Sequence, residues 1–64
     1  MKTIETRELV VNDVFTHELK PYGRERFLVI GVTENHILCK SRNSGKEMKK
    51  KRDGNVVLLR HIDD

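Results

Sequence analysis

Apolar residues in this 64-residue chain fall in short runs, and each run is separated from the next by residues that favour turns. The turn segments are residues 12–13, 20–23, 34–35, 43–46 and 53–55. Between them, residues 27–33 are the strongest strand candidate, because their aliphatic side chains alternate at period two. No segment repeats apolar residues at helical spacing over about three turns. The pattern therefore predicts an all-β fold of about five short strands.

The length of the chain constrains how those strands are arranged. A domain of this size buries only about 60% of its unfolded surface, so it has room for one core. An open sheet would expose two edges and a whole face, which favours closure into a small, strongly bent barrel. We therefore expect a single domain over residues 1–64, with the five-stranded barrel at 9–62. Residues 1–8 are expected either to be flexible or to form a short helical turn.

The connection at residues 34–35 is the clearest local signal for a hairpin. Two polar residues, Glu34 and Asn35, separate two β-like runs. A two-residue hairpin turn requires the left-handed conformation, which asparagine tolerates well. The sequence therefore predicts a tight hairpin with Asn35 in that conformation.

Residues 11–15, Val-Asn-Asp-Val-Phe, have the form of an apolar, turn, Asp, apolar entry to a first strand. A longer loop through Pro21 and Gly23 follows, and then three closely linked strands and a short final one. In this order the chain resembles the SH3-like barrels, a group that includes Tudor, KOW and Sm-type modules. The resemblance covers residues 9–62, rests on the number and order of strands, and implies a small five-stranded barrel. Asn12 stands where many such modules have glycine, and the KOW glycine pattern is missing.

Lysine and arginine are concentrated in residues 40–52, which hold seven cations and one anion and so carry a net charge of +6. The whole chain carries +3, which leaves −3 for the remaining residues. The cations are Lys40, Arg42, Lys46, Lys49, Lys50, Lys51 and Arg52. If the turn at 43–46 joins two strands, this segment is a basic hairpin. Its second strand then presents Met48, Lys50 and Arg52 on one face and Lys49 and Lys51 on the other.

Three interpretations of the basic hairpin stay open. The first is nucleic-acid binding through phosphate contacts, to which Arg24 and Arg26 contribute. The second is a protein-interaction module, or a regulator that docks on an acidic protein surface, with Tyr22, Met48 and Arg52 as contact residues. The third is protection of an exposed sheet edge by lysines. A monomer or a small homo-oligomer fits all three.

The remaining residue types argue against catalysis, metal binding and cofactors. Three histidines and Cys39 do not stand at the spacing of a zinc site, and no glycine-rich phosphate loop or spaced carboxylate pair is present. Phe15 and Phe27 lie in strand runs and are expected in the core, which leaves Tyr22 as the available ring. A lone cysteine, expected to be a buried thiol, indicates a reducing compartment. The longest apolar runs are four residues, too short to cross a membrane, so we expect a cytoplasmic binding protein.

Overall fold

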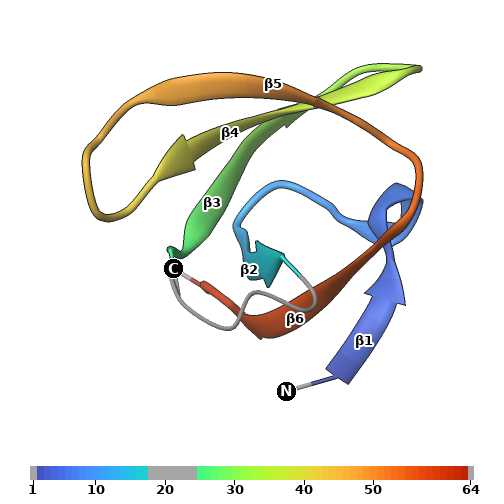
Figure 1. Ribbon diagram of the computed structural model, residues 1–64, viewed down its shortest axis with the longest axis horizontal. Helices are drawn as coiled ribbons and strands as arrows, with labels where there is room; N and C mark the ends of the chain where they lie inside the picture. Colours follow the sequence, from blue (N-terminus) through green and yellow to red (C-terminus); the bar gives the residue numbers. More distant parts are fainter. Residues whose placement is uncertain (1, 18–24, 64) are drawn as a thin grey trace.

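One curled antiparallel sheet of six strands, in the order β1-β6-β2-β3-β4-β5, makes up the fold (Figure 1). The computed structural model describes residues 2–17 and 25–63. The elements are β1 (Lys2–Glu5), the 3-10 turn η1 (Thr6–Glu8), β2 (Asp13–His17), β3 (Phe27–Val32), β4 (His36–Ser41), β5 (Glu47–Lys51) and β6 (Asn55–His61). The described residues contain no α-helix. The all-β expectation is confirmed.

The sheet has six strands where the sequence predicted five, and the additional one is β1. It pairs antiparallel with β6, placing Ile4 opposite Val56, and Ile4 packs against the core. The helical turn expected within residues 1–8 occupies only Thr6–Glu8. Because β1 has a single apolar side chain, its extended form comes from its hydrogen-bonded partner and not from an alternating pattern of its own.

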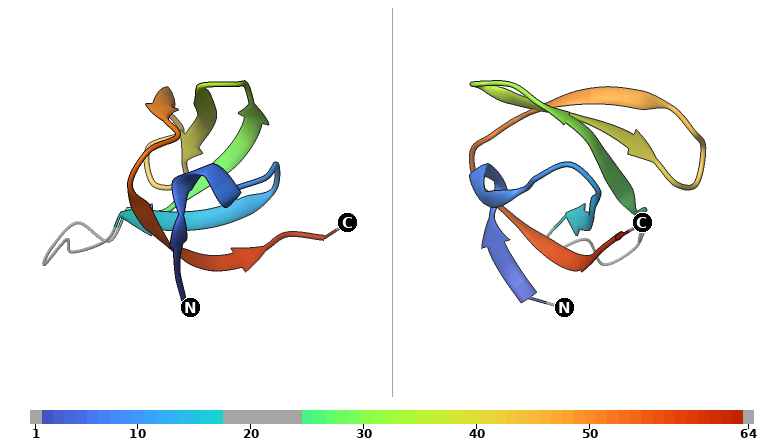
Figure 2. Two further views of the ribbon diagram at one scale, coloured as in Figure 1. Left: turned by 90° about the vertical axis from the view of Figure 1, so that its right-hand side faces the viewer. Right: turned by 180° about the vertical axis from the view of Figure 1, so that it is seen from behind.

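Two irregularities in strand pairing accompany the bending of the sheet. The register shifts between Val14 and Phe15 where β2 meets β6, and between Val29 and Gly31 where β3 meets β4. Such bulges increase the local twist and let a sheet fold over on itself. The result is a half-barrel in which β3, β4 and β5 lie over β1, β6 and β2 (Figures 1 and 2). The two outermost strands, β1 and β5, are not paired with each other.

The concave side of the half-barrel holds the core. Phe15 on β2 lies opposite Phe27 on β3, and the two rings stack with their centroids 5.5 Å apart. The buried cluster consists of Leu9, Phe15, Phe27, Val29, Ile37, Cys39 and Val56. The predicted core positions of both phenylalanines and of the Cys39 thiol are confirmed, since each is at most 4% exposed.

The β3–β4 hairpin turns at the predicted place, but residues 33–35 connect the strands and its backbone differs from the expectation. Asn12 is the one residue other than glycine with positive φ in the described part of the chain, at 80°, so Asn35 is not left-handed. The Thr33 N–H donates to the His36 carbonyl, and the Thr33 hydroxyl accepts from the His36 N–H. Because that hydroxyl takes the place of the Thr33 carbonyl as acceptor, the turn does not need a left-handed residue.

Candidate nucleic-acid interface

The basic hairpin consists of the end of β4, the turn at 42–46, β5 and Arg52. Its register pairs Ile37 with Lys50 and Cys39 with Met48. Residues opposite one another share a face, and Ile37 and Cys39 are buried, so Met48 and Lys50 lie on the concave face. The other residues of β5, Glu47, Lys49 and Lys51, therefore lie on the convex face. The two faces of β5 carry the residues that the sequence predicted for each, and the register shows that Lys49 and Lys51 face outward.

The convex face of the hairpin carries three exposed lysines. Lys49 lies opposite Leu38, Lys51 lies opposite His36, and Lys40 lies opposite Glu47. Leu38 is 38% exposed, so the lysines surround an accessible apolar side chain. Because these lysine side chains point away from the core, their charges are available to a ligand.

Lys50 on the concave face has a different environment. It is half-buried and lies close enough to Cys39 to influence the thiol. Burial raises the pKa of Cys39, and the positive charge of Lys50 lowers it by a smaller amount. A buried thiol with a raised pKa is a poor nucleophile, which agrees with the structural role expected for this cysteine.

Three further cations lie at the end of the hairpin where the turn connects β4 to β5. The Ser41 hydroxyl accepts from the backbone N–H groups of Asn43 and Ser44, at 3.2 and 3.1 Å, and donates to the Glu25 carboxylate at 2.5 Å. The Arg42 N–H donates to the Arg26 carbonyl at 2.8 Å, which holds the two backbones side by side. The three exposed cations at this end are Arg26, Arg42 and Lys46.

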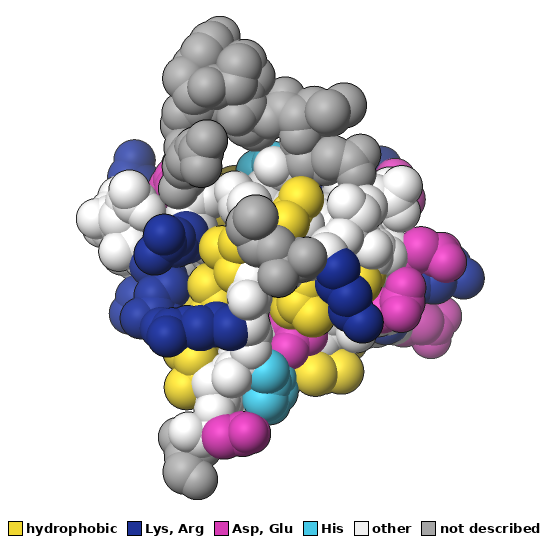
Figure 3. All heavy atoms as spheres, turned by 90° about the horizontal axis from the view of Figure 1, so that it is seen from below, with side chains coloured by type: hydrophobic (Ala, Val, Ile, Leu, Met, Phe, Trp, Pro, Cys, Tyr) yellow, Lys and Arg dark blue, Asp and Glu magenta, His cyan; other side chains and the backbone are white. Residues whose placement is uncertain are grey.

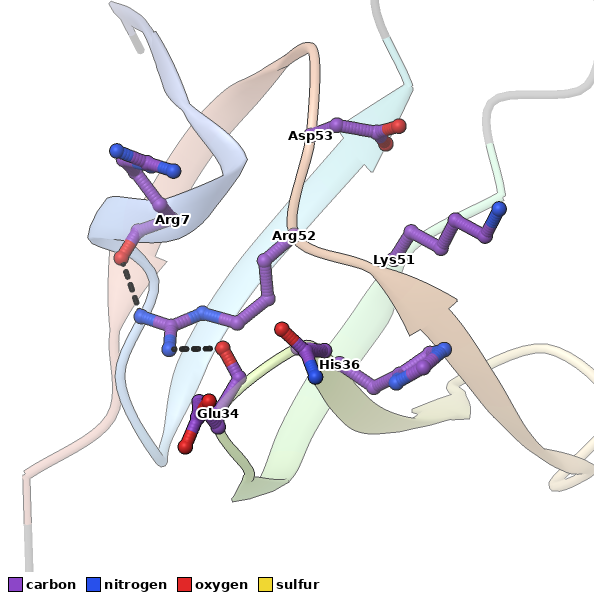
Figure 4. A pocket seen from close by; sticks show the side chains of 7 residues that line it. Arg7, Glu34, His36, Lys51, Arg52 and Asp53 are labelled. Atoms are coloured by element: carbon purple, nitrogen blue, oxygen red, sulfur yellow. Dashed lines mark hydrogen bonds between the residues drawn. The ribbon is translucent and has the colours of Figure 1, made fainter.

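Arg52 differs from the other cations because its guanidinium is hydrogen-bonded to backbone carbonyls of other parts of the fold (Figure 4). Nη1 donates to the carbonyls of Thr33 and Glu34 at 3.0 and 3.3 Å, and Nη2 donates to the carbonyl of Arg7 at 2.7 Å. Arg52 thereby joins the β3–β4 turn to η1, and we call this set of bonds the Arg52 clamp. It lies in an open pocket of about 290 Å³ lined by Arg7, Glu34, Asn35, His36, Lys51, Arg52 and Asp53.

Two of the candidate residues, Tyr22 and Arg24, lie outside the described residues. Met48 is 46% exposed at the edge of the sheet, where it is available for contact. Phe15 and Phe27 are buried, so neither ring is available to stack on a base. Within residues 2–17 and 25–63, the accessible chemistry of the hairpin is therefore cationic and aliphatic and not aromatic.

A pair of titratable residues that the sequence did not indicate lies between β2 and β6. Nδ1 of His61 is 2.6 Å from Oδ1 of Asp13, a buried carboxylate that also accepts from the Val10 N–H at 2.9 Å. The hydrogen bond to Asp13 raises the pKa of His61, and the nearby carboxylate of Asp63 contributes to the rise. The two residues are 48 positions apart, so no local sequence signal could have joined them.

Charge is unevenly distributed over the surface. In the view of Figure 3, Lys and Arg side chains form a group on the left, and the Asp and Glu side chains on the right lie beside further Lys and Arg side chains. Hydrophobic side chains lie exposed between the left and right groups. A group of like charges on one side orients a charged partner as it approaches.

The chain matches no protein-family model, no curated protein and no solved structure. Among residues 2–17 and 25–63 there is no group of three or more histidine, cysteine or acidic side chains placed to hold a metal ion. The same residues form no helix with the length and apolarity needed to cross a bilayer.

Proposed function

We propose that the protein binds nucleic acid through phosphate contacts made by the basic hairpin and Arg26. One observation carries the proposal: six exposed cations lie on the basic hairpin and beside it, with one exposed carboxylate, Glu47, opposite Lys40. The six are Arg26, Lys40, Arg42, Lys46, Lys49 and Lys51. The ion pairs formed within the described residues both belong to His61, so none of these cations is in a salt bridge there. An excess of positive charge of this kind attracts phosphates through the release of condensed counterions.

The kinds of side chain exposed on the hairpin also support a particular mode of nucleic-acid binding. Sequence-tolerant single-strand binders stack bases on exposed rings, and both described phenylalanines are buried. Aliphatic and cationic side chains can contact a sugar-phosphate backbone without reading base edges. We therefore expect binding that is independent of sequence and no tighter for single strands than for duplexes.

The first experiment is a titration against fluorescent duplex DNA, single-stranded DNA and structured RNA, at about 50 and about 200 mM salt. With about four to six phosphate contacts, log K should fall against log salt with a slope of roughly −4 to −5 on duplex DNA. Absence of binding to all three at the lower salt would contradict the proposal and leave the lysines as edge protection.

A pair of triple variants separates the hairpin from net charge. Lys40, Lys49 and Lys51 are changed to Glu in one, and the exposed Lys2, Arg7 and Arg60 are changed to Glu in the other. Both variants alter the net charge equally, and only the first changes the convex face of the hairpin. We expect the first to lose binding and the second to keep most of it. Equal losses would show that binding depends on overall charge alone.

The same proposal includes a binding role without catalysis, a cytoplasmic location and a monomer or small homo-oligomer. A kinship with the SH3-like barrels also belongs to it. Docking on an acidic protein surface is the second candidate, and the open edge at β5 favours it.

A further inference from the structure

The outer edge of β5 is an unused hydrogen-bonding surface. Two backbone bonds define the ladder between β4 and β5: Ser41 N–H donates to the Lys46 carbonyl, and Arg52 N–H donates to the Asn35 carbonyl. In an antiparallel pair, every second residue bonds to the partner strand and the others point away. Met48 and Lys50 therefore bond to β4. The backbone groups of Glu47, Lys49 and Lys51 point outward from the sheet.

This edge has the geometry that an added strand requires. β5 is the last strand of the sheet and pairs with β4 over five residues without a register shift. It contains no proline, and no other described residue is hydrogen-bonded to its outer side. Edges that resist pairing are usually short, bulged or twisted away. At β5 the lysine side chains are the remaining protection, and their charge repels basic strands but not acidic ones.

The side chains along the edge specify the chemistry of a partner strand. On the convex face, Lys49 and Lys51 would lie beside the side chains of an incoming strand, where opposite charge is stabilising. On the concave face, Met48 is 46% exposed and adjacent to the core residue Cys39, so an apolar side chain fits there. Over Met48–Lys51 the matching strand thus alternates acidic and apolar residues, and opposite Glu47, which shares the convex face, it carries a residue that is not acidic.

We infer that β5 binds an extended acidic segment of a partner protein by edge-to-edge strand addition. The partner's backbone would pair with the outward groups of Glu47, Lys49 and Lys51, as in other cases of β-augmentation. A second copy of this chain fits less well. β5 carries a net charge of +2 from three lysines and one glutamate, so two copies of the strand repel each other, and the antiparallel register centred on Lys49 would place Lys49 against Lys49. The inference does not depend on nucleic-acid binding, although both ligands would use Lys49 and Lys51 and would compete.

The test uses a fluorescent, end-blocked peptide of about seven residues in which valine and glutamate alternate, with binding followed by anisotropy. A second peptide has the same sequence but carries N-methyl groups on alternate residues, which removes the donors that face β5. A third peptide has lysine in place of glutamate. We expect the first peptide to bind, the N-methylated peptide to bind at least about tenfold more weakly, and the lysine peptide not to bind.

Two substitutions at one position test the strand itself. Lys49→Thr removes the charge and keeps the backbone donor, whereas Lys49→Pro removes both. Because the Lys49 N–H points outward, proline there leaves the β4–β5 ladder intact. We expect the threonine variant to lose a few-fold in peptide affinity and the proline variant to lose at least about tenfold more. Circular dichroism of both variants checks the fold.

The outcomes separate the inference from the proposed function. Lys49→Thr and Lys49→Pro carry the same charge, so they should bind duplex DNA equally whether or not strand addition occurs. Equal affinity of the plain and N-methylated peptides would overturn the inference, because binding would then depend on charge alone. This comparison needs no variant, so it remains decisive even if Lys49→Pro fails to fold. Dimerisation of the free protein that Lys49→Pro abolishes would overturn the choice of partner in favour of a second copy.

Discussion

The Arg52 clamp allows a quantitative prediction about stability. Replacing Arg52 with Ala removes three hydrogen bonds from a charged group to the carbonyls of Arg7, Thr33 and Glu34. Such bonds contribute about 1.5 kcal/mol each at the low end of their range, which suits carbonyls near the surface. Nε of Arg52 is buried without a partner, and that orphaned donor costs about 1–2 kcal/mol. The net loss of unfolding free energy is therefore about 3 kcal/mol.

That loss is large for a domain of 64 residues, whose total stability is about 3–10 kcal/mol. In a domain of this size, 1 kcal/mol corresponds to about 4–8 °C in Tm, so Arg52→Ala should lower Tm by about 12–24 °C. Urea unfolding followed by circular dichroism gives the free energy, and a thermal scan gives Tm.

Two further variants identify the cause of the loss. Arg52→Lys keeps the charge, but an ammonium cannot span the carbonyls of Arg7 and Glu34 as the planar guanidinium does. We expect it to recover less than half of the loss, and Arg52→Met, which keeps only the aliphatic stem, to recover less still. If Arg52→Lys or Arg52→Met has the stability of the original protein, the clamp does not stabilise the fold.

Three further predictions concern the core and the titratable groups. The pKa of His61 is raised above about 6.5 by Asp13, so the stabilisation from this pair is complete below about pH 6.5 and is lost as pH rises through the folded pKa. The urea midpoint should therefore fall between about pH 6 and pH 9, and His61→Gln should remove that fall. Ile37→Ala should cost about 2–5 kcal/mol in urea unfolding, whereas Ile30→Ala, at a position 39% exposed, should cost less than about 1 kcal/mol. Because burial raises the pKa of Cys39, a thiol reagent should label it slowly in the native protein and rapidly in urea.

The strands that were predictable from sequence are those with their own apolar alternation. Residues 27–33 indicated β3, which the structure places at Phe27–Val32. β1 could not be predicted, because Lys-Thr-Ile-Glu has one apolar residue and owes its extended form to pairing with β6. A propensity is a weak guide wherever the partner strand supplies the hydrogen bonds.

The candidate binding surface was predictable only in part for a related reason. Period-two alternation separated Lys49 and Lys51 from Met48 and Lys50, but alternation alone does not say which set faces the core. That decision came from the register, which places Met48 opposite the buried Cys39. The role of Arg52 was out of reach, because its acceptors are backbone carbonyls 18, 19 and 45 residues away. Every residue has a backbone carbonyl, so the sequence does not indicate which carbonyls accept a hydrogen bond from Arg52.

Closure of the half-barrel relates the Arg52 clamp to the binding role that we propose for the basic hairpin. β1 and β5 do not pair, and the gap between them is bridged near residues 52–54 by the Arg52 clamp and by Thr6, whose N–H donates to the Gly54 carbonyl. Closure by these contacts leaves the outward groups of β5 free. In the nucleic-acid binding that we propose, Arg52 would position β5 and would not contact phosphate. Under conditions where both variants are folded, Lys49→Gln should therefore reduce the salt slope by about 0.9, whereas Arg52→Gln should leave it unchanged. A reduction of similar size for Arg52→Gln would place Arg52 among the phosphate contacts and refute its assignment as a positioning residue.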